Sequence, residues 1–179
     1  MFVYQYLNIE NHQAISESIK KYLIDHTSVF EEKLMWKFLD VNQLISHVPE
    51  IEKIFSAFDL KISIAAAVYR KPFSQGGIHI DTSEFYRVLF PVMNCQGSKT
   101  KFFEYDETKF RAGGGGDGDK NLTLIQGQQL KFLDEFELSR PVIFNPKIPH
   151  GVYSNPVCKE PRVSITFGFN KDPRNILTS

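Results

Sequence analysis

The segment from Pro161 to Phe169 constrains the fold more than any other part of this 179-residue chain. Read as a strand, it places alternate side chains on opposite faces. The first face is apolar and the second is polar: the first holds Val163, Ile165, Phe167 and Phe169, and the second Arg162, Ser164, Thr166 and Gly168. A polar face on so apolar a strand indicates a polar cavity inside the protein. The chain therefore needs a sheet with a core on one side and a cavity on the other.

Arg162 would carry its positive charge into that cavity, and burying such a charge without a partner is unfavourable. The carboxylate of a small ligand could accept two parallel hydrogen bonds from the guanidinium. Ser164, two positions along the same face, could donate to the same group. A carboxylate of the protein, such as Glu104 or Asp134, is the alternative partner.

The chain from residue 61 onward has the pattern of a β-rich region. The segment 61–70 alternates between an apolar face and a face of small residues that ends in Tyr69. Segments 85–94 and 100–105 are predicted to be the two strands of a hairpin. Further short strands, separated by Gly and Pro turns, are expected at 122–125, 130–138, 141–145 and 151–154. Short strands with such turns favour a sandwich or barrel.

The N-terminal part of the chain is predicted to be mainly helical. Apolar residues recur at helical spacing from His12 to His26, and Asn11 has the side chain of an N-cap. Asp40 is expected to cap a short helix, and Pro49 to begin another. The segment 2–7 could form an edge strand.

We expect a single domain over residues 1–179, because the sequence shows no internal repeat and no sign of a second domain. Residues 1–60 would supply helical support, and residues 61–170 the β core. The pattern of the stretch 31–40 is compatible with either a strand or a helix. Trp36, within that stretch, is expected to be a core residue, with a platform for the substrate as the alternative.

Composition argues against several classes of protein. Lys+Arg and Asp+Glu are balanced at 21 each, which argues against a long nucleic acid as partner. The sequence has no apolar run long enough to span a bilayer and no secretory signal. Cys95 and Cys158 are expected to be free thiols of a cytoplasmic protein. The glycine-rich segment 112–120 is expected to be a surface loop, with a lid over a site as the alternative.

A candidate metal site begins in the segment 77–81, where His79 and Asp81 would share one strand face. His150, next to a proline and a glycine, is the candidate third ligand. Two imidazoles and one carboxylate on one side of a metal leave the other side open, which suits Fe(II) with a cosubstrate and oxygen. A zinc hydrolase could use the same ligands, so these three residues leave the metal open.

The order His79-x-Asp81, then His150, then Arg162-x-Ser164 resembles the signature of the Fe(II)- and 2-oxoglutarate-dependent dioxygenases. The resemblance covers roughly residues 62–169. Residues 87–94 are also similar to the strand after the H-x-D motif in small phage and bacterial hydroxylases of this superfamily. The resemblance implies a mainly β fold with N-terminal helices, in which a double-stranded β-helix (jelly-roll, cupin-like) core is backed by those helices.

The resemblance also implies an activity. His79, Asp81 and His150 would hold Fe(II) and form the catalytic centre. 2-Oxoglutarate would chelate the metal, with its far carboxylate on Arg162 and Ser164. With oxygen as the other cosubstrate and ascorbate as a stimulant, the enzyme would hydroxylate an unidentified protein side chain or small molecule, and release succinate and CO2.

Three further residues are candidates for the lining of the site, and two other functions are alternatives. By resemblance, Tyr69 would lie against the cosubstrate, although it could also be a core phenol. Arg87 and Asn94 are weaker candidates for the pocket lining. The rival functions are a non-redox cupin-like metal-binding module and a metal-dependent isomerase or hydrolase. Arg162 separates them, because a non-redox cupin has no need for an arginine and serine pair facing its metal.

Overall fold

The structure is a computed structural model that describes residues 2–32, 36–81, 83, 85–112 and 122–177. The helices are α1 (His12–His26), α2 (Val29–Glu32), α3 (Val41–His47) and α4 (Pro49–Ser56), with two 3-10 turns, η1 (Glu107–Lys109) and η2 (Pro173–Leu177). The strands are β1 (Tyr4–Tyr6), β2 (Trp36–Phe38), β3 (Ile62–Arg70), β4 (His79–Ile80), β5 (Arg87–Met93), β6 (Lys99–Phe103), β7 (Phe110–Ala112), β8 (Leu122–Leu124), β9 (Phe132–Glu137), β10 (Val142–Phe144), β11 (His150–Tyr153) and β12 (Arg162–Phe169). Except for Ala112, the glycine-rich segment 112–120 lies outside the described residues, so its role as a loop or lid stays a prediction.

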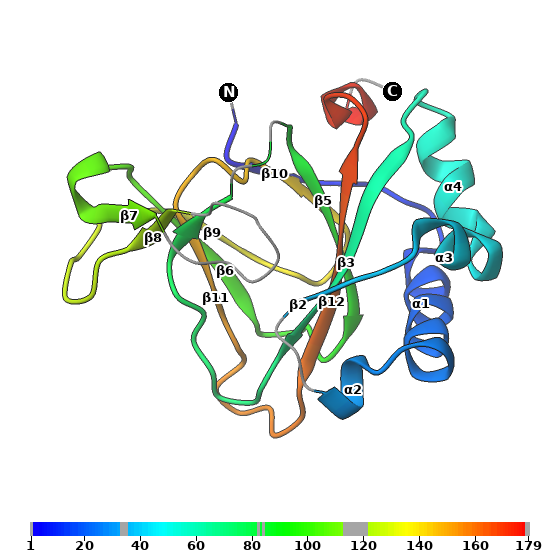
Figure 1. Ribbon diagram of the computed structural model, residues 1–179, viewed down its shortest axis with the longest axis horizontal. Helices are drawn as coiled ribbons and strands as arrows, with labels where there is room; N and C mark the ends of the chain where they lie inside the picture. The colour runs from blue at the N-terminus through cyan, green and yellow to red at the C-terminus, as the bar shows by residue number, and fades with distance from the viewer. Residues whose placement is uncertain (1, 33–35, 82, 84, 113–121, 178–179) are drawn as a thin grey trace.

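The strands form two antiparallel sheets (Figure 1). The first sheet has six strands in the order β1-β10-β5-β12-β3-β2, and the second has six in the order β7-β8-β4-β11-β6-β9. From β3 to β6, and again from β9 to β12, consecutive strands alternate between the two sheets. This connectivity is that of a jelly roll. The expected mainly β fold with N-terminal helices is thereby confirmed.

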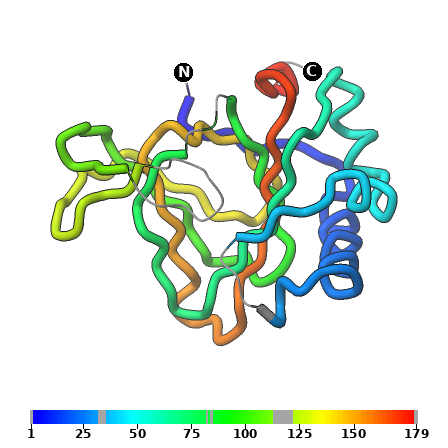
Figure 2. The backbone as a smooth tube through the Cα atoms, in the orientation of Figure 1, coloured from blue at the N-terminus to red at the C-terminus, as the bar shows by residue number. Residues whose placement is uncertain are grey.

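The helices cover the outer face of the first sheet, on the right-hand side of Figures 1 and 2. α1 contacts β5, and α3 contacts β3. The apolar face of β12 points to these helices, because Val163, Ile165 and Phe167 belong to the same buried cluster as the apolar residues of α1, α3 and α4. Phe55 of α4 packs against the first sheet. Its ring centroid lies 5.7 Å from the ring centroid of Phe167 and 4.8 Å from that of Phe169.

The helix ends confirm one cap and correct another. The carboxylate of Asp40 accepts a hydrogen bond from the backbone N–H of Gln43 at 3.0 Å, so the predicted cap of α3 is confirmed. Asn11 has a φ of 56° and makes no side-chain cap bond, although α1 begins at His12 as expected. An N-cap residue needs an extended backbone, whereas asparagine tolerates the left-handed conformation that it adopts here. The predicted cap at Asn11 is therefore wrong.

The edge strand expected in the segment 2–7 is confirmed, since β1 pairs with β10 at one edge of the first sheet. The stretch 31–40 contains a strand, β2, which pairs with β3 at the other edge, so residues 1–60 supply strands as well as helices. One expectation about the strands is corrected. β5 and β6 do not form a hairpin. β5 pairs with β10 and β12, whereas β6 pairs with β9 and β11 in the other sheet. The turn at Gly97, whose φ is 70°, carries the chain across the sandwich.

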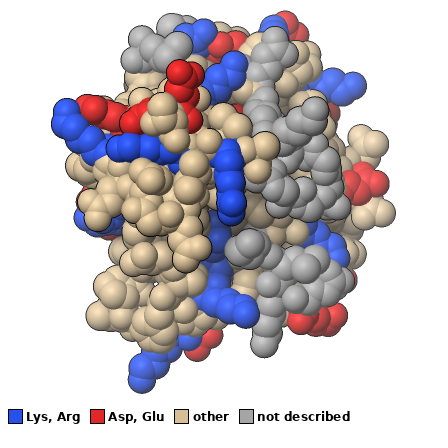
Figure 3. All heavy atoms as spheres, turned by 60° about the vertical axis from the view of Figure 1, so that its left-hand side comes forward, with Lys and Arg blue, Asp and Glu red and all other residues tan. Residues whose placement is uncertain are grey.

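The surface in Figure 3 carries charges of both signs. Lys and Arg side chains lie close to Asp and Glu side chains at the upper left of this view. This distribution agrees with the equal numbers of basic and acidic residues, 21 of each. Among the described residues, no helix is long and apolar enough to cross a membrane.

Phe55→Ala is expected to lower the free energy of unfolding by about 3–5 kcal/mol, because it removes a fully buried ring between α4 and the first sheet. Urea denaturation followed by circular dichroism measures this change. Ile24→Ala on α1, where the side chain is 56% exposed, is the control and should change stability by less than about 0.5 kcal/mol. Equal effects of the two substitutions would contradict the assigned helix–sheet core.

Candidate metal centre

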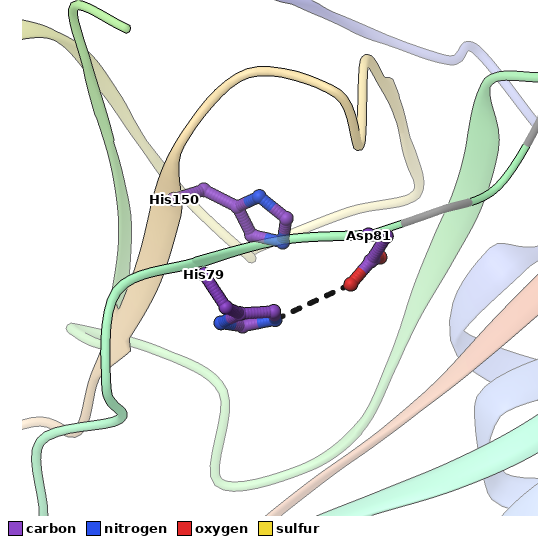
Figure 4. Close-up of side chains that lie close together, drawn as sticks. All are labelled: His79, Asp81 and His150. Carbon is purple, nitrogen blue, oxygen red and sulfur yellow. Dashed lines mark ion pairs between the residues drawn. The ribbon is translucent and has the colours of Figure 1, made fainter. Parts of the chain in front are cut away.

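Three potential metal ligands come together between the sheets: His79, Asp81 and His150 (Figure 4). β4 and β11 are antiparallel neighbours, and their register places His150 directly opposite His79. Asp81 follows β4, and its backbone N–H donates to the carbonyl of Pro146 at 3.0 Å. One ligand atom from each of the three side chains lies within 4.8 Å of the other two. The structure thus brings together the three residues that the sequence singled out.

Backbone carbonyls orient both imidazoles. Nδ1 of His79 lies 3.0 Å from the carbonyl oxygen of Gly77, and Nδ1 of His150 lies 2.9 Å from that of Ile148. A proton on each Nδ1 leaves each Nε2 with a free lone pair, as ligating histidines require. Nε2 of His79 lies 3.4 Å from Oδ1 of Asp81, so both atoms can approach one cation.

The environment keeps His150 uncharged. Its side chain is buried, and this burial lowers the pKa of His150 to about 4. The nearby His79 contributes to this lowering of the pKa, while the carboxylate of Asp81 opposes it. A neutral imidazole at physiological pH is the form that binds a metal ion.

Arg162 lies in the same cavity, and its guanidinium has no acidic partner among the described residues. The residue is 2% exposed, and neither Nε nor Nη1 has a hydrogen-bond partner. The two acids considered as partners are engaged elsewhere, because Glu104 pairs with Lys131 and the carboxylate of Asp134 accepts from a backbone N–H. The alternative that Arg162 pairs with Glu104 or Asp134 is therefore wrong. Burial lowers the pKa of Arg162.

Further polar groups converge on the same cavity. Ser164 is fully buried, and its hydroxyl lacks a partner. Thr100 of β6 lines the cavity from the second sheet and also has a buried hydroxyl without a partner. Arg70 lies opposite Arg162 in the pairing of β3 with β12. The sequence reasoning missed Thr100 and Arg70, although the alternation that placed Arg162 on the polar face applies equally to them.

Tyr69 lies on the other face of the first sheet. It is opposite Val163 in the ladder, and it packs in the helix-side cluster with Ile165 and Phe167. The expectation that it lies against the cosubstrate is therefore wrong, and the alternative of a core phenol holds. The inward face of β3 is the one that ends in Arg70.

Arg87, Asn94 and Trp36 also differ from expectation. Nε of Arg87 donates to Ser83, and the side-chain amide of Asn94 donates to the carbonyl of Pro161. Neither is among the described residues that line the metal cavity. Trp36 does line the cavity and is 39% exposed, so it is not a core residue. The reason is that β2 is an edge strand, with no described strand beyond it in the first sheet.

Comparison with known proteins establishes the fold alone. The sequence matches no family model and no curated protein. Among solved structures, the chain resembles AviO1 from Streptomyces viridochromogenes Tue57, with a TM-score of 0.50 and 10% identity over 94% of this chain and 90% of that one. It resembles SnoN from nogalamycin biosynthesis, described as a non-heme alpha ketoglutarate dependent epimerase, with a TM-score of 0.56 and 9% identity over 92% and 76%. It also resembles apo HygX from Streptomyces hygroscopicus, with a TM-score of 0.55 and 11% identity over 93% and 81%.

His79→Ala and His150→Ala are each expected to lower the affinity for Fe(II) by more than about 100-fold, because the loss of an outer-shell partner alone costs about 10–100-fold. Anaerobic calorimetric titration with Fe(II) measures this change. His12→Ala, at the start of α1, is the control and should bind as the wild type does. If His79→Ala and the wild type bound iron equally, the ligand assignment would be wrong.

Proposed function

We propose that this protein is an Fe(II)- and 2-oxoglutarate-dependent dioxygenase that hydroxylates its substrate and releases succinate and CO2. His79, Asp81 and His150 would hold the iron and form the catalytic centre. Arg162 and Ser164 would bind the far carboxylate of 2-oxoglutarate. The substrate would be a small molecule or a protein side chain.

The donor set fits iron. Two imidazoles and one carboxylate from adjacent backbone segments would occupy one side of a metal and leave its other positions open. When bound there, iron with 2-oxoglutarate supplies the activation of oxygen. The chain's own contribution is the fixed direction of each ligand, because backbone carbonyls hold both Nδ1 atoms.

The single observation that carries the proposal is that Nε and Nη1 of the buried Arg162 guanidinium have no hydrogen-bond partner. A fully buried cation with free N–H groups, in a cavity that also holds the three candidate ligands, needs an anion. A dicarboxylate that reaches from the metal to Arg162 meets that need, and its far carboxylate could accept a bidentate pair. A non-redox cupin would leave this charge unexplained.

Two neighbouring hydroxyls strengthen the argument. Ser164 Oγ and Thr100 Oγ1 are buried in the same cavity without partners, and each could donate to the carboxylate that Arg162 binds. Together these groups would fix one end of 2-oxoglutarate at the floor of the cavity. A solved complex of SnoN with Fe3+, alpha ketoglutarate and nogalamycin RO has a TM-score of 0.54 to this chain at 8% identity, so the same fold can hold these groups.

The wild-type protein is expected to convert 2-oxoglutarate to succinate when supplied with Fe(II), ascorbate and air, even without a substrate. Removing an anchoring charge-assisted pair costs about 1.5–3 kcal/mol, so Arg162→Met should raise the KM for 2-oxoglutarate by roughly 10- to 150-fold. Succinate is quantified by mass spectrometry.

Two results would decide against this assignment. Arg111→Ala, which removes an exposed arginine of β7, is the matched control and should keep the wild-type KM. Equal KM values for Arg162→Met and the control would exclude the carboxylate role of Arg162. Folded, iron-loaded wild type that neither binds 2-oxoglutarate nor forms succinate would disprove the dioxygenase assignment.

Thr100→Val is expected to stabilise the ligand-free protein while weakening cosubstrate binding. A buried hydroxyl without a partner costs about 1–3 kcal/mol, so its removal should raise the free energy of unfolding by about 1 kcal/mol. The loss of one donor should weaken 2-oxoglutarate binding about tenfold. Urea denaturation and equilibrium dialysis measure the two effects.

The matched control for this substitution is Thr27→Val. The hydroxyl of Thr27 donates to the backbone carbonyl of Leu23, so its removal should lower stability instead. Cosubstrate binding should stay unchanged. If both substitutions shifted stability in the same direction, Thr100 would have a partner that the ligand-free fold already supplies.

A further inference from the structure

Trp36 stands at the boundary between the metal cavity and solvent. It lines the cavity together with His79 and Asp81, yet 39% of the residue is exposed. The apolar residues deeper in the same cavity, Val68 and Leu89, are buried. The indole ring is thus an apolar part of the cavity lining that is also in contact with solvent.

The register of the first sheet explains this position. Trp36 lies opposite Val68 in the pairing of β2 with β3, and Val68 lies opposite Ser164 in the pairing of β3 with β12. The three side chains therefore share the cavity face of the sheet. Phe38 is two positions along β2 on that same face and is 49% exposed. Two aromatic side chains therefore lie on the same face of the edge strand β2.

Trp36 and Phe38 are both partly exposed, at 39% and 49%, and neither has an aromatic or cationic partner among the described residues. Phe144, deeper in the cavity, in contrast contacts Phe102 and His150. A partly exposed aromatic ring without an aromatic or cationic partner can stack on a planar ring from outside. The indole N–H adds a hydrogen-bond donor at the same place.

We propose that Trp36, with Phe38 beside it, recognises a planar unsaturated ring of the substrate by stacking, at the mouth of the metal cavity. The inference rests on the proposed function, since it assigns the substrate class of that same site. It narrows the substrate to a ring-bearing small molecule rather than an aliphatic side chain. The ring would lie on Trp36, and the part of the substrate nearest His79 and Asp81 would react.

The chain contains one tryptophan, so a nitrogen-15 NMR spectrum holds one indole N–H signal that reports on Trp36 alone. The experiment uses the full chain loaded with Zn(II), a redox-inert diamagnetic ion, and 2-oxoglutarate. Two neutral probes of matched shape are titrated, 2-naphthylmethanol and its saturated counterpart decahydro-2-naphthylmethanol. The aromatic probe should move the indole proton upfield in a saturable way, because a stacked ring shields it, and the saturated probe should not.

Variants then separate stacking from general apolar binding. Trp36→Ala should weaken binding of the aromatic probe about tenfold, as followed by ligand-observed NMR, while Trp36→Phe should retain most of it. Phe132→Ala removes a 52% exposed ring from the second sheet and should bind as the wild type does. Equal indole shifts with the two probes, unchanged affinity in Trp36→Ala, or no binding of the aromatic probe would overturn the proposal.

Failure of this proposal is distinguishable from failure of the proposed function. Binding of Zn(II) and of 2-oxoglutarate to the wild type is measured by calorimetry on the same samples. If both bind and the aromatic probe leaves the indole signal in place, only the ring recognition by Trp36 is wrong. If the indole signal shifts but neither metal nor 2-oxoglutarate binds, the ring site stands and the dioxygenase assignment falls.

Discussion

The burial of the Arg162 charge is the constraint on which the interior of this protein depends. β12 lies between β3 and β5 near the middle of the first sheet, and its first residue, Arg162, is 2% exposed. Arg70 stands opposite it in the ladder, and burial together with Arg162 lowers the pKa of Arg70. Like charges at neighbouring ladder positions oppose each other. This end of the cavity is therefore strongly positive, and the three candidate metal ligands face the same space.

The two faces of the first sheet have different roles: the outer face stabilises the fold, and the inner face carries polar groups of the candidate site. Its outer face packs against the helices through a large apolar cluster, in which residues such as Val163, Ile165 and Phe55 are fully buried. Its inner face carries buried polar atoms without partners, which lower stability. The outer core can offset that deficit, because burial of apolar surface is the dominant favourable term in folding.

The candidate metal centre owes its geometry to the backbone of the second sheet rather than to side-chain packing alone. β4 has only two residues, yet its pairing with β11 and β8 fixes the position of His79. The carbonyls of Gly77 and Ile148 set the two imidazole rings, and the carbonyl of Pro146 holds the backbone at Asp81. A site held by main-chain hydrogen bonds keeps its ligands in place before a metal arrives.

The sequence by itself determined the mainly β class, the bounds of α1, and the three candidate metal ligands with Arg162 and Ser164, because these follow from local periodicity and from residue chemistry. Only the tertiary structure decided which face of β3 points into the cavity. That face carries Arg70 and not Tyr69. It also sent β5 and β6 to different sheets and left Trp36 at an open edge. Strand alternation assigns side chains to two faces but cannot say which face meets the cavity, since that depends on partners distant in the sequence. The unpartnered atoms of Arg162, Ser164 and Thr100 likewise became visible only after long-range packing showed that no described acidic side chain reaches them.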